Sequence, residues 1–140
     1  MPARPTESVA PVLPKNFVRP CLLLLLREHP AHGYDLLERL RAFGFDGADP
    51  GGLYRTLRQL EDGGLVRSAW QPSSTGPDRR VYDLTRTGME ELHSSAKALA
   101  GGSEILKIFL SRYEEFVTLR ASRAAEARKD PIVNGAPSEA

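Results

Sequence analysis

The sequence predicts a mainly helical α+β fold, in which three short helices precede a two-stranded hairpin and a long helix follows it. Three observations support this prediction. Apolar residues recur at helical spacing in three segments between residues 17 and 62. The spacing then approaches the alternation of strands between residues 65 and 84. From residue 85 onward, apolar residues return at alternating three- and four-residue steps, as in helices that pair with other helices.

The composition indicates a small cytoplasmic protein rather than a secreted or membrane protein. With 140 residues, the chain has room for one domain and its appendages. The single cysteine, Cys21, excludes an internal disulfide and favours a reducing compartment. The longest apolar run, residues 21–26, is far shorter than the roughly 20 residues that span a bilayer, so no membrane partner is predicted. A net charge of +1 gives no overall nucleic-acid signature, so a DNA-binding hypothesis depends on where the charges lie.

Both ends of the chain are predicted to lie outside the folded part. Residues 1–15 are rich in proline and predict a flexible arm. Residues 124–140 include Pro131, Gly135 and Pro137 and predict a disordered tail. The ordered part is therefore expected over residues 16–123.

The first two helices are predicted over residues 17–28 and 33–43. Leucines in the first segment occupy nearly every face, which indicates a helix buried on nearly every side. Pro30 ends it. The second helix has one apolar stripe, and Gly44 is a natural stop for it. That stripe consists of Leu36, Leu37, Leu40 and Phe43.

The third helix is predicted to open at Asp49 and Pro50, an aspartate cap followed by a proline in the first turn. Its apolar residues Leu53, Leu57 and Leu60 follow helical spacing, and two glycines close it at residue 63.

The hairpin is predicted from residues 65–70 and 80–84, which alternate as half-buried strands do. Residues 72–78 between them have turn chemistry throughout. Three helices followed by a two-stranded hairpin with a polar tip is the order of a winged helix-turn-helix, here residues 16–84.

The final helix is predicted over residues 85–123, with a kink or break at Gly101 and Gly102. A lone helix cannot bury so long an apolar seam, so it needs the body of its own domain, a second copy, or both. We expect it to form a homodimer interface. The predicted interface residues are Leu92, Leu99, Leu106, Phe109, Leu110, Tyr113, Phe116 and Val117.

No residue pattern indicates an enzyme, a metal site or a cofactor. His29 and His32 lie on either side of Pro30 and cannot share a regular helical face. Cys21 stands in a leucine run, which indicates a small core residue rather than a nucleophile. The sequence has no phosphate-binding glycine loop followed by lysine.

Two clusters of polar and cationic residues instead indicate DNA binding. With the leucines of the third helix turned inward, its other residues point outward, and their types bind phosphates and base edges. A second cluster lies at the hairpin, where a wing would meet the backbone or the minor groove. The predicted DNA-binding residues are Tyr54, Arg55, Thr56, Arg58, Gln59, Arg79 and Arg80.

A few aromatic residues are candidates for binding a small-molecule effector. Trp70, the only tryptophan, either packs the hairpin onto the domain or lines a planar-ligand site at the dimer interface. Phe109 and Tyr113 either belong to the dimer core or contribute to the same site.

Four motifs occur in one order: His32-Gly33-Tyr34-Asp35-Leu36, residues 52–61, Gly64-Leu65-Val66, and residues 80–88. Together they resemble the PadR family of transcriptional regulators. The resemblance implies a bacterial or archaeal homodimer, generally a repressor, joined through a carboxy-terminal helix. It also places Tyr54, Arg55 and Arg58 on the recognition helix and Arg79 and Arg80 on the wing.

The function predicted is that of a sequence-specific, double-stranded-DNA-binding regulator. We expect a homodimer on a pseudo-palindromic operator, modulated by a small-molecule effector near the dimer interface. Two alternatives are a winged-helix protein-interaction module, and a ligand- or nucleotide-binding protein with little DNA affinity.

Overall fold

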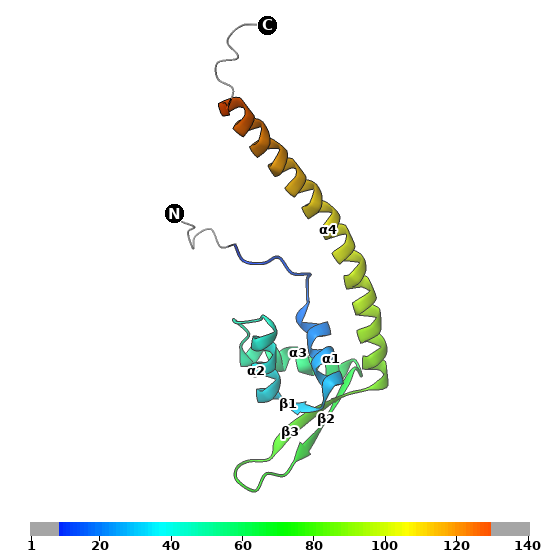
Figure 1. The fold of residues 1–140 in the computed structure, drawn as a ribbon. Helices are drawn as coiled ribbons and strands as arrows, with labels where there is room; N and C mark the ends of the chain where they lie inside the picture. Colours follow the sequence, from blue (N-terminus) through cyan, green and yellow to red (C-terminus); the bar gives the residue numbers. More distant parts are fainter. Residues whose placement is uncertain (1–8, 130–140) are drawn as a thin grey trace, which may run out of the picture. The chain divides into compact units, whose positions relative to one another are not determined.

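The computed structural model describes residues 9–129, and the predicted α+β winged-helix class is confirmed (Figure 1). The chain divides into two units after Ala96. The first unit contains α1 (Val18–Glu28), β1 (Ala31–His32), α2 (Gly33–Phe43), α3 (Pro50–Asp62), β2 (Val66–Gln71) and β3 (Arg79–Leu84). The last helix, α4 (Arg86–Lys129), begins in the first unit and makes up the described part of the second.

Strand β1 is the element that the sequence pattern does not predict. It pairs antiparallel with β3, with Ala31 opposite Tyr82 and His32 opposite Val81. The hairpin partner β2 lies on the other side of β3, so the sheet has three strands in the order β1-β3-β2 rather than the two expected. Two residues are too few to show strand alternation, and this strand is recognised only through its pairing.

The side-chain cap predicted for α3 is present, α2 has a side-chain cap that was not predicted, and α1 has none. The Asp49 carboxylate accepts a hydrogen bond from the Gly52 backbone N–H at 3.2 Å, so the predicted cap of α3 is confirmed. At α2, the His32 ring nitrogen Nδ1 accepts from the Asp35 N–H at 3.4 Å. Gly44, at φ 140°, ends α2 in a conformation that favours glycine.

One hydrophobic core joins the three short helices to the sheet. Its fully buried side chains come from every one of these helices and from β2. Among the leucines of α1, Leu24 is the exception to burial, with 37% of its surface exposed. The largest fully buried side chains are Leu22, Leu23, Leu26, Leu36, Leu40, Leu57, Leu60 and Val66.

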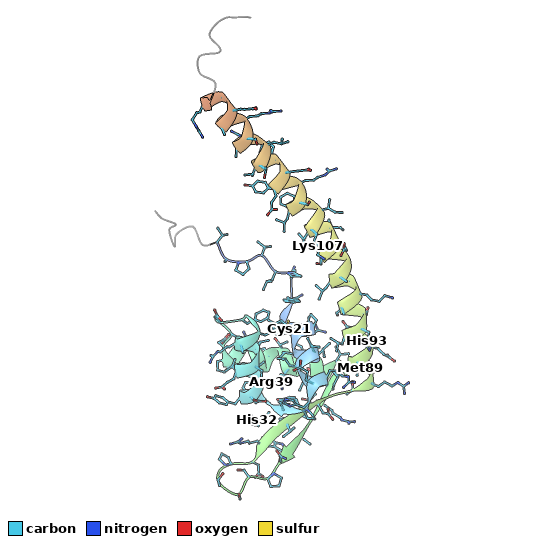
Figure 2. The ribbon with its side chains drawn as sticks, in the orientation of Figure 1. Cys21, His32, Arg39, Met89, His93 and Lys107 are labelled. Atoms are coloured by element: carbon cyan, nitrogen blue, oxygen red, sulfur yellow. The ribbon has the colours of Figure 1, made fainter. Side chains whose placement is uncertain are left out.

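Arg39 of α2, labelled in Figure 2, contacts the end of α1. Its guanidinium donates to the Leu25 carbonyl at 2.8 Å and to the Glu28 carboxylate at 2.9 Å. It also lies 3.7 Å from the Asp35 carboxylate, one turn earlier on α2. Because a basic group caps the carbonyl end of α1, the angle between α1 and α2 is fixed by charge as well as by packing.

The first turns of α4 pack on the core of the first unit. Leu92 is buried and Met89 is partly buried against the core. Leu92, predicted as a dimer-interface residue, is therefore buried in the core of its own domain. The exposed part of the predicted apolar seam begins after it. Gly88 lies against the chain at Leu65, where the Thr85 N–H also donates to the Leu65 carbonyl at 3.1 Å.

We expect Gly88→Ala to lower the free energy of unfolding by about 1–3 kcal/mol, because the added methyl group would overlap the Leu65 carbonyl. Gly101→Ala is the matched control, since a methyl group there meets nothing within 4 Å and gains about 1 kcal/mol of helix propensity. Urea unfolding followed by circular dichroism measures both. Equal stabilisation by the two substitutions would contradict the packing of Gly88.

Helix α4 differs from the prediction at two places. It runs without interruption through Gly101 and Gly102, where a kink or break is expected from the sequence. It also continues to Lys129, so residues 124–129 are helical rather than part of a disordered tail. Strong helix formers surround the two glycines and fill residues 124–128, and the next proline comes only at Pro131. Residues 1–8 of the predicted arm and 130–140 of the predicted tail lie outside the described residues.

Candidate nucleic-acid interface

Helix α3 presents the polar face that its spacing predicts. Leu53, Leu57 and Leu60 are buried, as expected. The opposite face exposes Tyr54, Arg55, Arg58 and Gln59. Both guanidinium groups and the amide are therefore free to face a ligand along the helix, and these groups match the hydrogen-bonding edges of guanine and adenine.

Thr56 differs from its neighbours on α3. Its side chain is half-buried, and its hydroxyl donates to the Gly52 carbonyl of the same helix at 3.0 Å. The hydroxyl hydrogen is thus already used within α3, in the manner common for threonine in helices. Of the seven predicted DNA-binding residues, Thr56 is therefore the one that is not exposed.

Arg80 of the wing is held by a chain of contacts that reaches the end of α3. Its Nε donates to the Ser68 hydroxyl at 2.8 Å, and that hydroxyl donates to the Glu61 carboxylate at 2.7 Å. Its guanidinium also lies 3.9 Å from Glu61 and 5.4 Å from the centre of the Trp70 ring. These contacts orient Arg80 while leaving it exposed.

Arg79 makes its contact on the opposite side of the sheet's central strand. Its Nη1 lies 3.2 Å from Nε2 of His32, the residue that also caps α2 through Nδ1. A neutral ring whose Nδ1 accepts carries its hydrogen on Nε2, so the approach of Arg79 is a close contact between the wing and the start of α2 rather than a hydrogen bond. Figure 2 labels His32 at this place.

A hollow of about 480 Å³ lies where α2, α3 and the hairpin meet. Three exposed aromatic side chains, Tyr34, Tyr54 and Trp70, line it together with Arg79 and Arg80. Phenol hydroxyls and guanidinium groups both donate hydrogen bonds to phosphate oxygens. The hollow therefore suits an anionic group such as a nucleic-acid phosphate. The remaining lining residues are His32, Gly33, Asp78 and Tyr82.

Tyr34 also lines this site, although its position in the sequence alone predicts no role for it. It lies one position after Gly33 and off the leucine stripe of α2, so an exposed position could have been deduced from helical spacing. Its meeting with Tyr54 and the wing arginines depends on tertiary structure. Tyr82 is buried at the base, where burial raises the pKa of its hydroxyl and Arg80 opposes that rise, so the hydroxyl is protonated at neutral pH.

Gly33 determines where the Tyr54 ring lies. A methyl group at residue 33 would overlap that ring. We expect Gly33→Ala to displace Tyr54 and to weaken DNA binding roughly 10- to 100-fold, the effect of losing a hydrogen bond to a charged phosphate. Fluorescence anisotropy measures this loss by titration of a duplex that the parent protein enriches from random double-stranded DNA. Gly47→Ala is the control, because a methyl group there meets nothing within 4 Å. An unchanged DNA affinity of the Gly33→Ala variant would show that Tyr54 does not contact the DNA.

Residues 9–129 contain neither a metal-binding cluster nor an exposed thiol. No group of three or more histidine, cysteine or acidic side chains is placed to hold a metal ion there. Cys21 is buried, and desolvation raises the pKa of its thiol to about 11, so the thiolate is scarce at neutral pH. In this same part of the chain, no helix has the length and apolar character needed to cross a membrane.

The candidate effector residues line two separate hollows. Trp70 belongs to the hollow at the wing, whereas Phe109 and Tyr113 line one of about 470 Å³ on α4. The three residues are thus not brought together within one protomer. The hollow on α4 also includes Ile105, Ile108, Arg112 and Phe116.

A three-helix domain with a cationic helix face and an arginine-bearing wing defines the class of winged-helix regulators. The family model described as the transcriptional regulator PadR-like family matches residues 22–94, just over half of the 140-residue chain. The chain therefore belongs to the PadR-like family, which is a family of transcriptional regulators and not of enzymes. The comparison with curated proteins found no match.

Solved structures agree with this assignment. A PadR-like transcriptional regulator from Bacillus cereus is 26% identical with a TM-score of 0.63, over 69% of this chain and 93% of its own. A Streptococcus transcriptional regulator is 30% identical with a TM-score of 0.55, over 64% of this chain and 91% of its own. Bacillus subtilis PadR, solved in complex with operator DNA, is 27% identical with a TM-score of 0.52, over 56% of this chain and 46% of its own.

Proposed function

We propose that this protein is a sequence-specific DNA-binding regulator that acts as a homodimeric repressor on a pseudo-palindromic operator. The observation that carries the proposal is the exposed face of α3, where Arg55, Arg58 and Gln59 lie opposite the buried leucines. The hollow shared by Tyr54 and the wing arginines supports it. The operator complex of Bacillus subtilis PadR shows that a structural relative binds DNA.

The proposed interface divides its contacts between bases and backbone. Arg58 and Gln59 contact base edges, because their fork-shaped donors and acceptors match guanine and adenine in the major groove. Tyr54, Arg79 and Arg80 contact phosphates and so set position rather than sequence. In a dimer with two-fold symmetry, the two α3 helices enter half-sites whose centres lie about 34 Å apart.

The proposed effector site is the hollow on α4. Phe109, Tyr113 and Phe116 supply aromatic surface, and Arg112 supplies a positive charge beside it. These groups suit a planar aromatic molecule that carries a negative charge. Binding at the dimer interface would favour one spacing of the two α3 helices over another, which changes operator affinity. Trp70, at the other hollow, stacks under Arg80 and is assigned to the wing rather than to the effector.

Selection of bound sequences from random double-stranded DNA tests the proposal, with the enriched sequences titrated at two salt concentrations. We expect the enriched sequence to be palindromic. The affinity of the protein for it should fall steeply as the salt concentration rises, because phosphate contacts release counterions. A dimer that enriches no sequence, with or without added cell metabolites, would instead support the protein-interaction alternative. Tight binding of a nucleotide with no enriched duplex would support the ligand-binding alternative.

A further inference from the structure

The His32 ring uses one of its two nitrogens inside the protein. Nδ1 accepts a hydrogen bond from the Asp35 backbone N–H at 3.4 Å and so caps α2. A neutral imidazole carries one ring hydrogen, and the nitrogen that accepts a hydrogen bond cannot carry it. The cap therefore selects the tautomer with its hydrogen on Nε2. The half-buried ring of His32 thus presents an N–H donor at Nε2.

This N–H faces a second donor. Nη1 of Arg79 lies 3.2 Å from Nε2 of His32, and a guanidinium has no acceptor to offer. Within residues 9–129, no carboxylate lies at ion-pair distance from Arg79, whereas Arg80 lies 3.9 Å from Glu61. Two donors this close can share one acceptor oxygen about 2.9 Å from each. Nε2 of His32 and the Arg79 guanidinium, here called the donor pair, are therefore suited to a ligand that supplies this oxygen.

The donor pair belongs to the hollow at the wing, where other donors lie beside it. The Tyr54 hydroxyl lies against Gly33, since it is the nearest atom to a methyl group built there. Tyr34 lines the same hollow and is exposed. Asp78 is the acidic residue of this lining, and its carboxylate accepts from the Ser73 N–H at 3.4 Å within the hairpin loop. The donors favour an anion with several oxygens, such as a phosphate.

We propose that the donor pair holds one phosphate of the DNA backbone, so that a single phosphate joins the wing to the start of α2. The proposal rests on the DNA binding of the proposed function and adds His32 as a neutral phosphate-binding residue. Arg79 supplies the charge, and Nε2 of His32 supplies a hydrogen bond whose direction the cap of α2 fixes. Because the contact is to the backbone, it sets the position of the wing on the duplex and reads no base.

Two substitutions separate the roles of the two ring nitrogens. The Oδ1 atom of asparagine takes the place of Nδ1, so His32→Asn keeps a cap for α2 and removes the donor at Nε2. The amide nitrogen of glutamine takes the place of Nε2, so His32→Gln keeps a donor and removes the cap. Both variants are titrated by fluorescence anisotropy with a duplex that the parent protein enriches, and both are unfolded in urea.

We expect His32→Asn to weaken DNA binding roughly 10- to 100-fold, the effect of losing a hydrogen bond to a charged group, at an unchanged urea midpoint. His32→Gln should bind DNA nearly as tightly as the parent and unfold at a lower urea concentration, because its helix cap is lost. His29→Asn is the matched control. His29 is also exposed to solvent but lies outside the lining of the hollow, so its replacement should leave DNA affinity unchanged.

Methylphosphonate substitution identifies the phosphate. Each phosphate of the duplex is replaced in turn by the neutral methylphosphonate, and the affinities of the parent, His32→Asn and Arg79→Ala are compared. We expect one phosphate in each half-site at which the replacement weakens the parent clearly more than either variant, because each variant has already lost part of that contact. Different phosphates for the two variants would overturn the shared contact.

The remaining outcomes separate this inference from the proposed function. A His32→Asn variant that binds as tightly as the parent would overturn the inference and leave the proposed function intact. Equal losses of affinity in His32→Asn and His32→Gln would show that His32 acts only through the cap, which also overturns the inference. A parent protein that enriches no duplex would overturn the proposed function, and the inference with it.

Discussion

Arg58→Ala is expected to weaken binding to the selected operator roughly 5- to 150-fold, which corresponds to about 1–3 kcal/mol for one bidentate base contact. The sequence preference should relax at one base pair of each half-site, because the other contacts to DNA remain. Folding should be unaffected, since Arg58 is exposed on α3 and stands opposite its buried leucines. Repeating the DNA selection with the variant measures both effects.

The matched control for this substitution is Arg86→Ala. Arg86 is also a helical arginine, and its side chain is 93% exposed with a 4.0 Å contact to Glu90 of the same helix. Its removal lowers the net charge by the same amount, so it measures how much of the loss comes from net charge rather than from a contact to DNA. Equal losses of affinity in the two variants, with no change in sequence preference, would mean that Arg58 does not contact a base.

Leu57→Ala is expected to lower the free energy of unfolding by about 2–5 kcal/mol, because it leaves a cavity at a fully buried position where α3 meets the core. Domains of this kind have total stabilities of about 5–15 kcal/mol, so a large share is lost. Urea unfolding measures the loss. The operator affinity of the folded fraction should change little, since Leu57 points away from the exposed face of α3.

Leu24→Ala on α1 is the control for the core substitution. Its side chain is 37% exposed, so truncation removes fewer contacts and leaves no closed cavity. It should therefore be clearly less destabilising than Leu57→Ala. Similar losses in both variants would show that Leu24 is covered in solution, for example by a second copy of the chain.

Much of the winged helix could be predicted from local chemistry. Asp49 followed by Pro50 marks the start of α3, and the leucine spacing after it sets which face is buried. The same spacing exposes Arg58 and Gln59 on the other side. These features depend on residues within a few positions of one another, which is the range over which helical periodicity and capping act.

The helix α4 shows where local rules are insufficient. Two adjacent glycines predict a kink, since each costs about 1 kcal/mol relative to alanine. Gly101 and Gly102 are nevertheless helical, because the alanines and leucine at residues 98–100 and the residues that follow at 104–106 continue the hydrogen-bonded turns. The same surplus of helix formers extends α4 to Lys129. Summed propensity over a long window is more informative here than a single pair of residues.

By itself, the sequence determined the three helices, the hairpin, the polar face of α3 and the apolar seam of α4, because each is a short-range pattern. Only the tertiary structure decided that β1 joins the sheet, since a two-residue strand exists through its partner β3. Only the tertiary structure brought Tyr34 to Tyr54 and the wing arginines. It also placed Leu92 in the core of its own domain. Such contacts join residues that are far apart in the chain. The local spacing of apolar residues therefore does not predict which neighbour a side chain packs against.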